Sequence, residues 1–276
     1  MGAWDGAYAR DHQLAGTAQW RRTLPSSKMH LPWLHPGDPF PHPSQAWDER
    51  QPAPGLLAAG GALDVDSLQR AYASAIFPWF SEGQPILWWS TDPRMVLFTD
   101  EFRLHRSLRK TIARFAEDPR CEIRFDSDFD AVIRACATSQ RPGQSGTWIV
   151  PAMVSAYQAF HRAGFAHSVE TWIDGRLAGG LYCVVIGRAV FGESMFTRVP
   201  DASKIALAAL VAWCRQAQVP VVDCQQNTRH LASLGAREIP RAEFVQQVAV
   251  QGQRSAAAWQ FEPVYWNSVL PHSTSA

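Results

Sequence analysis

The chain has 276 residues, a formal net charge of +1 at pH 7, 46% hydrophobic residues and 18% charged residues. A chain of this length holds one large domain or two modest ones. The near-zero net charge argues against a protein that coats nucleic acid through overall basicity, but it leaves room for a local basic patch.

Five cysteines are scattered along the chain, odd in number and without any C-x-x-C pair. This pattern favours reduced thiols in a cytoplasm over a disulfide framework or a zinc site. The first residues, MGAWDGAYARDHQ, lack the basic-then-apolar pattern of a secretion signal. No run approaches the roughly 20 apolar residues of a membrane span. We therefore expect a soluble, cytoplasmic protein.

The first part of the chain is rich in proline, which breaks helices, and in histidine without metal-ligand spacing. We expect a poorly ordered extension there, then a small domain, a larger catalytic domain and a tail. The predicted boundaries are 1–45, 46–95, 96–262 and 263–276.

The segment after the extension predicts one helix and two strands. In GLLAAGGALDVDSLQRAYASAIFPWF, a glycine-rich turn precedes a helix that Asp64 or Asp66 would cap. The segment ILWWSTDPRMVLF reads as two strands broken at Asp92 and Pro93. Trp79 lies near two further tryptophans, and together they could form the wall of a pocket.

The segment EFRLHRSLRKTIARF, residues 101–115, predicts an amphipathic helix. Its apolar face carries Leu104, Leu108, Ile112 and Phe115. Its basic face carries Arg103, Arg106, Arg109, Lys110 and Arg114. A basic stripe of this kind can follow a phosphate backbone. A plain solvated helix face is the other interpretation, and the pattern leaves both open.

The remainder predicts two helices, three antiparallel strands, a helix, a strand and two further helices. The helices are expected at 125–137 (with Asp126 or Ser127 near its cap), 150–163, 203–218, 230–235 and 243–251, and the strands at 166–173, 177–187, 189–196 and 219–225. This order predicts an α/β (α+β) fold, a mixed sheet with helices on both faces. It resembles the acetyltransferase (GNAT) type, preceded by a small N-terminal domain.

Candidate catalytic side chains flank the predicted helix at 203–218. Alternation along the following strand places Asp223 and Gln225 on one face. A carboxylate beside an amide can hold the amide so that its oxygen accepts a hydrogen bond from a nucleophilic amine. Glu193 follows a glycine in the preceding strand, where it could bind a substrate ammonium group or form a salt bridge with Lys204 or an arginine.

Other chemistries fit the sequence less well. Ser194 in G-E-S-M-F lacks the final glycine of the nucleophile-elbow motif. Cys224 with His230 would be a cysteine nucleophile, but alternation turns Cys224 away from Asp223. A coenzyme A site would need a glycine-rich turn where this chain reads PDASKIAL.

Ten short motifs occur in an order that resembles the leucyl/phenylalanyl-tRNA–protein transferases over roughly residues 54–261. They are FPWF, PILWWSTDPR, GTWI, AHSVETW, GGLYCVVIG, FGESMF, DASK, DCQ, HLASLGA and IPR. The resemblance implies transfer of Leu or Phe, and less well Met, from aminoacyl-tRNA to proteins with N-terminal Arg or Lys. This modification marks the acceptor for degradation. It implies no cofactor and no metal, and we expect a monomer.

The resemblance also implies roles for individual residues. Asp223 and Gln225 would be catalytic, and Glu193 would bind substrate. The other implied substrate-binding residues are Trp79, Trp148, Ser194 and Met195. The implied tRNA-binding residues are Arg106, Arg109, Lys110 and Arg114.

The chain departs from the family pattern at a few positions. Val190 and Leu210 stand where some members carry phenylalanines, and Cys183 replaces a more usual glycine. These changes concern the size of the side-chain pocket. An aminoacyl-tRNA-dependent ligase or acyltransferase with another acceptor stays open as the alternative, as does a tRNA binder without enzymatic activity.

Overall fold

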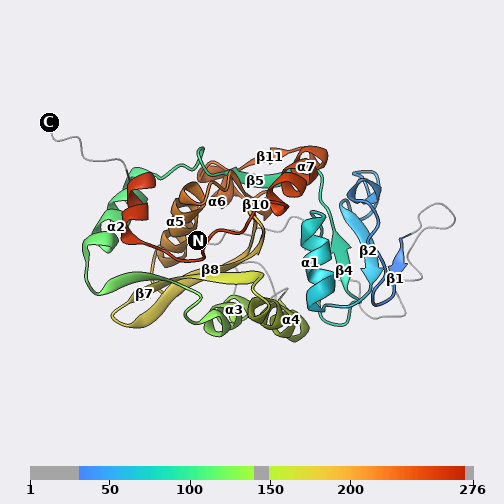
Figure 1. The fold of residues 1–276 in the computed structure, drawn as a ribbon, viewed down its shortest axis with the longest axis horizontal. Coiled ribbons are helices and arrows are strands. Elements are labelled where there is room, and N and C mark those ends of the chain that lie inside the picture. The colour runs from blue at the N-terminus through green and yellow to red at the C-terminus, as the bar shows by residue number, and fades with distance from the viewer. Residues whose placement is uncertain (1–30, 140–148, 271–276) are drawn as a thin grey trace.

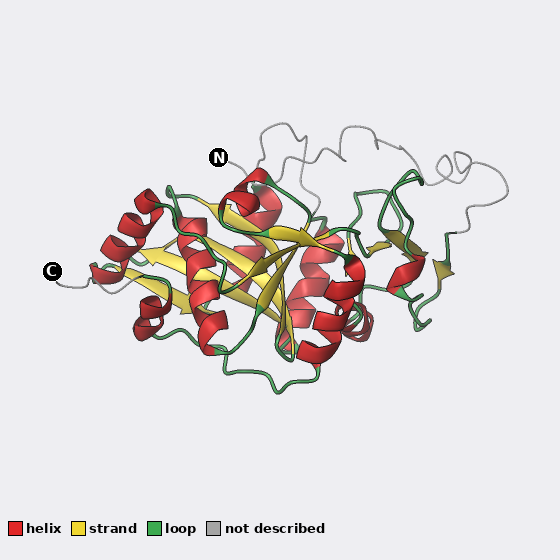
Figure 2. Ribbon diagram, turned by 90° about the horizontal axis from the view of Figure 1, so that it is seen from above, coloured by secondary structure: helices red, strands yellow, loops and turns green. Residues whose placement is uncertain are grey.

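The computed structural model describes residues 31–139 and 149–270, which form two mixed sheets with helices around them (Figures 1 and 2). The strands are β1 (Trp33–Leu34), β2 (Leu56–Gly60), β3 (Phe77–Pro78), β4 (Leu87–Trp89), β5 (Arg94–Phe98), β6 (Cys121–Phe125), β7 (Ala166–Ile173), β8 (Arg176–Ile186), β9 (Ala189–Thr197), β10 (Val221–Gln225) and β11 (Arg237–Ile239). The helices are α1 (Val65–Ala73), α2 (Arg106–Glu117), α3 (Phe129–Thr138), α4 (Pro151–Arg162), α5 (Ala202–Gln216), α6 (Arg229–Ser233) and α7 (Arg241–Gly252), with 3₁₀ helices at Pro43–Gln45 and Pro263–Ser268.

The smaller sheet has the strand order β1-β2-β4-β3 and packs beside α1 at one end of the molecule (Figure 1). Asp64 caps α1 by accepting a hydrogen bond from the Ser67 amide at 2.7 Å. It is one of the two residues that the sequence predicted as the cap. Strand β2, which the sequence did not predict, runs up to Gly60, and both Gly60 and Gly61 have the positive φ expected of the predicted glycine-rich turn. Leu34 is buried and belongs to β1, so the predicted poor order of residues 1–45 is wrong for this part.

The larger sheet has the order β11-β5-β10-β9-β8-β7-β6, and the mixed α/β class predicted from the sequence is confirmed. Strands β9 and β10 run parallel, and the other described neighbours in this sheet run antiparallel. The parallel pairing covers only the matches of Val222 with Val190 and Asp223 with Phe191. Beyond these residues β9 and β10 part, which opens a gap in the middle of the sheet.

Helices cover both faces of the larger sheet (Figure 2). Apolar side chains of α1, α3, α4 and α7 form one core with the sheet, and those of α2, α5 and α6 form another. Strand β8 contributes to both, because Tyr182 and Val184 face the first core and Leu181 and Cys183 face the second. Helix α5 is apolar nearly all round, as expected of a helix covered on several sides.

Two helices begin later than the sequence predicted. Helix α2 starts at Arg106, not at residue 101. Helix α3 starts at Phe129 with Asp128 as its cap, so the predicted caps Asp126 and Ser127 are wrong. Helix α3 starts late because the unpredicted strand β6 pairs with β7 up to Phe125. Asp126 then accepts a hydrogen bond from the Ser168 amide at 2.7 Å.

The described part of the C-terminal segment contains the 3₁₀ helix Pro263–Ser268. Trp266 lies in the predicted tail, yet it is buried in the core beside α5. Within the described ranges, the structure contains no helix that is both long enough and apolar enough to cross a membrane.

Candidate functional site

The candidate site lies where β9 and β10 part, and each strand carries a β-bulge there. In β9, Ser194 pairs with Tyr182 while Gly192 pairs with the next residue of β8, so Glu193 is the extra residue. In β10, Cys224 is the extra residue beside β5. A bulge re-aims side chains locally. The bare Gly192 allows close approach, because a Cβ there would lie 3.3 Å from the Asp223 carbonyl oxygen.

Glu193 is the centre of a buried hydrogen-bond cluster and is only 4% exposed. Its Oε1 accepts a hydrogen bond from the Tyr72 hydroxyl at 2.7 Å and from Gln225 Nε2 at 3.4 Å. Its Oε2 accepts one from the Tyr157 hydroxyl at 3.3 Å, and the two tyrosine hydroxyls also bond to each other. Among the described residues Glu193 forms neither of the predicted salt bridges, and Lys204 pairs with Asp201 at 2.7 Å instead.

The environment of Glu193 makes its carboxyl group hard to ionise. Burial, reinforced by the nearby Asp223 carboxylate, raises the pKa of Glu193 from 4.5 to about 8, while the tyrosine hydrogen bonds and Arg94 partly oppose this shift. Burial and the Glu193 charge also raise the pKa values of Tyr72 and Tyr157, which keeps both hydroxyls protonated as donors. A carboxyl group that titrates near neutrality suits a site that handles amines.

Asp223 is fully buried and bound by an equally buried arginine. Arg94 Nε donates to Asp223 Oδ1 at 2.8 Å, and the second guanidinium nitrogen donates to Oδ2 at 2.7 Å. Asp223 Oδ1 also accepts the backbone N–H of Gln225 at 3.0 Å. The sequence predicted that Asp223 would hold the side-chain amide of Gln225. That prediction is wrong, because the amide bonds to Glu193 and Asp223 takes the backbone.

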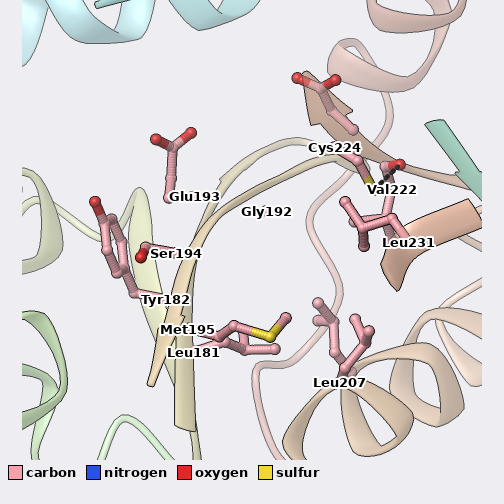
Figure 3. A pocket seen from close by; sticks show the side chains of 12 residues that line it. Leu181, Tyr182, Gly192, Glu193, Ser194, Met195, Leu207, Val222, Cys224 and Leu231 are labelled. Atoms are coloured by element: carbon pink, nitrogen blue, oxygen red, sulfur yellow. Dashed lines mark hydrogen bonds between the residues drawn. The ribbon is translucent and has the colours of Figure 1, made fainter. Parts of the chain in front are cut away.

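An apolar pocket opens beside this cluster. Figure 3 shows the side chains of Met195, Leu207 and Leu231 lying to one side of β9, while the Glu193 carboxylate extends to the other. The lining residues come from β8, β9, β10, α5 and α6: Leu181, Tyr182, Gly192, Glu193, Ser194, Met195, Leu207, Leu210, Val222, Asp223, Cys224 and Leu231. The gap between the strands therefore has a polar side and an apolar side.

The other predicted substrate-binding residues fall in different places. Ser194 and Met195 line the pocket. Trp79 directly follows β3 and is half-buried, its ring lies 5.4 Å from that of Trp89, and it is not among the lining residues. Trp148 lies outside the described residues. Burial raises the pKa of the Cys224 thiol, which disfavours the thiolate that nucleophilic attack would need.

The basic face of α2 comprises Arg106, Arg109, Lys110 and Arg114, and all four side chains are exposed. Within the described ranges none of them pairs with a carboxylate, and Arg109 donates to the Leu104 carbonyl oxygen at 3.3 Å. The predicted apolar face is buried at Leu108, Ile112 and Phe115 and packs onto the sheet beside β6. In Figure 1, α2 lies at the end of the molecule opposite the smaller sheet, away from β10.

Three residues of the site were not predicted: Arg94, Tyr72 and Tyr157. Arg94 stands in the motif PILWWSTDPR, but nothing local indicates that it reaches β10. The tyrosines sit in apolar helical stripes of α1 and α4, where a core role is the ordinary interpretation. Across the described residues, no group of three or more His, Cys, Asp and Glu side chains could hold a metal ion.

A buried acid and amide beside an apolar pocket fit an enzyme that joins an amine to an apolar acyl group. The family model for leucyl/phenylalanyl-tRNA protein transferase matches residues 96–249, and the model for the N-terminal domain of that family matches residues 61–92. The chain belongs to this family.

Similar proteins carry the same family name. The chain is 63% identical to the leucyl/phenylalanyl-tRNA--protein transferase of Polaromonas sp., over 87% of this chain and 94% of that one. It is 61% identical to that of Albidiferax ferrireducens, over 91% and 100%, and 57% identical to that of Bordetella petrii, over 84% and 92%. A solved structure of a functionally unknown protein from Staphylococcus epidermidis covers 67% of this chain and 68% of its own at 8% identity, but its TM-score of 0.33 is too low to assign a fold.

Proposed function

We propose that the protein transfers leucine or phenylalanine, and less well methionine, from aminoacyl-tRNA to proteins with N-terminal Arg or Lys. The observation that carries the proposal is family membership, with relatives at 57–63% identity over most of the chain. The modified acceptors would be marked for degradation. The protein would act as a monomer in the cytoplasm, where charged tRNA is present.

The donor side chain would occupy the apolar pocket beside β9. Leu, Phe and Met are apolar and unbranched at Cβ, which matches walls formed by residues such as Met195, Leu207 and Leu210. An apolar pocket separates side chains by only about 1–3 kcal/mol per methylene, so some use of Met-tRNA is expected. Leu210 stands where some members carry phenylalanine, and we propose that it tunes the preference between Leu and Phe.

The chemistry would be attack of the acceptor's α-amino group on the aminoacyl ester. The C–N bond forms, the bond from the carbonyl carbon to the tRNA 3′ oxygen breaks, and one proton moves from the amine to that oxygen. The ester is already activated, so the enzyme mainly needs to hold a neutral amine in attack geometry. An α-amino group has a pKa near 8, about where Glu193 titrates.

The polar side of the gap would hold the reacting amines. We propose that Glu193 binds an amino group and, by accepting the hydrogen bond from Gln225 Nε2, orients the amide so that its oxygen accepts from the attacking amine. Asp223 would act through Gln225, because its oxygens are engaged by Arg94 and by the Gln225 backbone. Trp79 and Trp148 would flank the adenosine end of the donor.

The tRNA body would be bound by the basic face of α2. An exposed stripe of Arg and Lys without carboxylate partners among the described residues has the character expected of a phosphate-binding surface.

We also propose that the larger sheet is of the acetyltransferase type. The parallel strands β9 and β10 diverge after a two-residue match and have helices on both faces. Helix α5 begins after Asp201 without a glycine-rich turn, which disfavours coenzyme A as the ligand.

The test is transfer of radiolabelled leucine from charged tRNA to a peptide that begins with Arg. We expect label in this peptide and none in a matched peptide that begins with Glu. Labelling of neither peptide would overturn the proposal. Labelling of a different acceptor, such as a cell-wall precursor amine, would favour the alternative aminoacyl-tRNA-dependent ligase.

A further inference from the structure

Arg94 is the most deeply buried arginine of the site, with no exposed surface. An arginine stays protonated inside proteins, and burying its charge is costly unless the charge is paired. Here Asp223 accepts two hydrogen bonds from the guanidinium group. The rings of Phe77 and Phe244 lie 4.7 Å and 4.6 Å from its central carbon, so the group is held by ion pairing and by two aromatic contacts.

A chain of contacts leads from this arginine to the candidate catalytic amide. Asp223 Oδ1, fixed by Arg94, accepts the backbone N–H of Gln225. Gln225 has a φ of +54°, in the left-handed region that a non-glycine residue adopts only when its surroundings hold it there. Thr91 Oγ1 donates to the Gln225 carbonyl oxygen at 3.2 Å. In this backbone conformation the amide of Gln225 reaches Glu193.

The other charged groups near Asp223 cannot replace Arg94 as the partner of its carboxylate. Glu193 is the second buried carboxyl group of the cluster and interacts unfavourably with Asp223. Arg241 of α7 is the other cation nearby, but it pairs with Asp92 at 3.7 Å. Without the guanidinium, Asp223 would lose the two hydrogen bonds that fix its buried carboxylate, which would weaken its hold on the Gln225 backbone.

We propose that Arg94 is a positioning residue for the transfer reaction: it holds Asp223, and through Asp223 the left-handed backbone that aims the Gln225 amide at Glu193. This inference rests on the proposed function. It extends the catalytic unit into the segment that joins the two sheets, because Arg94 begins β5 directly after the smaller sheet and Phe77 belongs to that sheet.

The experiment compares Arg94→Gln and Arg94→Lys with the wild-type enzyme in the leucine-transfer assay, at a temperature at which each variant is folded by circular dichroism. We expect kcat to fall about 100-fold for Arg94→Gln, the loss typical of a misplaced reacting group. Arg94→Lys keeps the charge but loses the bidentate geometry, so kcat should fall less in this variant than in Arg94→Gln. The KM for Leu-tRNA should not change, because the proposed tRNA surface lies on α2.

The matched control is Arg237→Gln. Arg237 also makes two hydrogen bonds to one carboxylate, that of Glu101, and lies 4.1 Å from the Phe98 ring, but it is half-exposed on the neighbouring strand β11. Its loss should leave kcat and KM unchanged. Equal kcat losses in the Arg94 and Arg237 variants would overturn the inference.

The split between kcat and KM separates positioning from a merely structural role. A wild-type kcat in both folded Arg94 variants, or a loss confined to KM, would each overturn the inference. If Arg94→Gln does not fold, a reduced kcat at unchanged KM in Arg94→Lys supports it and an unchanged kcat overturns it. An inactive wild-type enzyme overturns the proposed function and this role with it.

Discussion

The buried cluster around Glu193 and the exposed basic face of α2 are both rich in charge, yet the charges are organised in opposite ways. In the cluster, Glu193 and Asp223 are almost completely buried, and each accepts at least three hydrogen bonds. On the basic face of α2 the four side chains are exposed and lack carboxylate partners among the described residues.

Buried and exposed charges contribute to the energetics of the protein in different ways. Buried charges interact strongly and depend on exact pairing, so removing one partner has a large effect. Exposed charges are screened by salt within about 8–10 Å, so each contributes little and they act as a sum. Substitutions in the cluster should therefore change catalysis and stability, and substitutions on α2 should change only the use of tRNA and its salt dependence.

The largest effect should come from Asp223→Ala. It leaves the Arg94 charge buried without its partner, which typically costs about 3–5 kcal/mol of unfolding free energy. It also removes the anchor of the Gln225 backbone, so kcat should fall by about 100-fold or more. Urea unfolding and the transfer assay measure the two effects. Wild-type transfer at saturating substrates would show that Asp223 has no part in catalysis.

Glu193→Gln should change how stability depends on pH. The pKa of Glu193 is about 8 in the folded protein against 4.5 as its ordinary value, so the folded state holds a proton there that the unfolded state releases. The stabilisation of the folded state that this extra proton provides is fully present below pH 4.5 and is lost as pH rises toward 8.

The unfolding free energy of the wild type should thus fall relative to Glu193→Gln by on the order of a few kcal/mol over that window. Urea unfolding of both proteins between pH 5 and pH 9 measures the difference. A constant difference across the window would contradict the raised pKa.

Tyr72→Phe and Tyr157→Phe provide a graded pair. Each removes one buried donor to Glu193, and the loss of such a hydrogen bond costs about 1–3 kcal/mol. Tyr72 makes the shorter bond, 2.7 Å against 3.3 Å, so its substitution should destabilise the protein more. Thermal unfolding ranks the two variants. The reverse order would show that the shorter bond from Tyr72 to Glu193 is not the stronger of the two.

The smallest effect per residue is expected on α2. Replacing Arg106 and Lys110 with Ala should raise the KM for Leu-tRNA and lower the slope of log affinity against log salt by about 0.7–0.9 per lost phosphate contact. Unfolding free energy should not change. Arg134→Ala, which removes an exposed arginine of α3, is the control. Equal loss of activity with an aminoacyl-adenosine donor would contradict the assignment of α2 to the tRNA body.

Local pattern predicted the long elements of the fold well. The first two of the three strands at 166–197 are joined by the predicted turn at Asp174 and Gly175, both of which adopt positive φ as a tight hairpin requires. Helix α4 starts at the predicted proline. Strands β1, β2, β3, β6 and β11 were missed because they are at most five residues long and gain their hydrogen bonds from partners elsewhere in the sequence.

The sequence by itself determined the family, the mixed α/β class and the short list that contains Glu193, Asp223 and Gln225, because each of these is readable within a few residues. Only the tertiary structure decided how these groups act. Tyr72 lies 121 residues from Glu193, and Arg94 lies 129 residues from Asp223. Bulges in β9 and β10 aim the side chains, and burial sets the pKa of Glu193. Burial and contacts across such separations are properties of the packed sheet, which no local stretch of sequence contains.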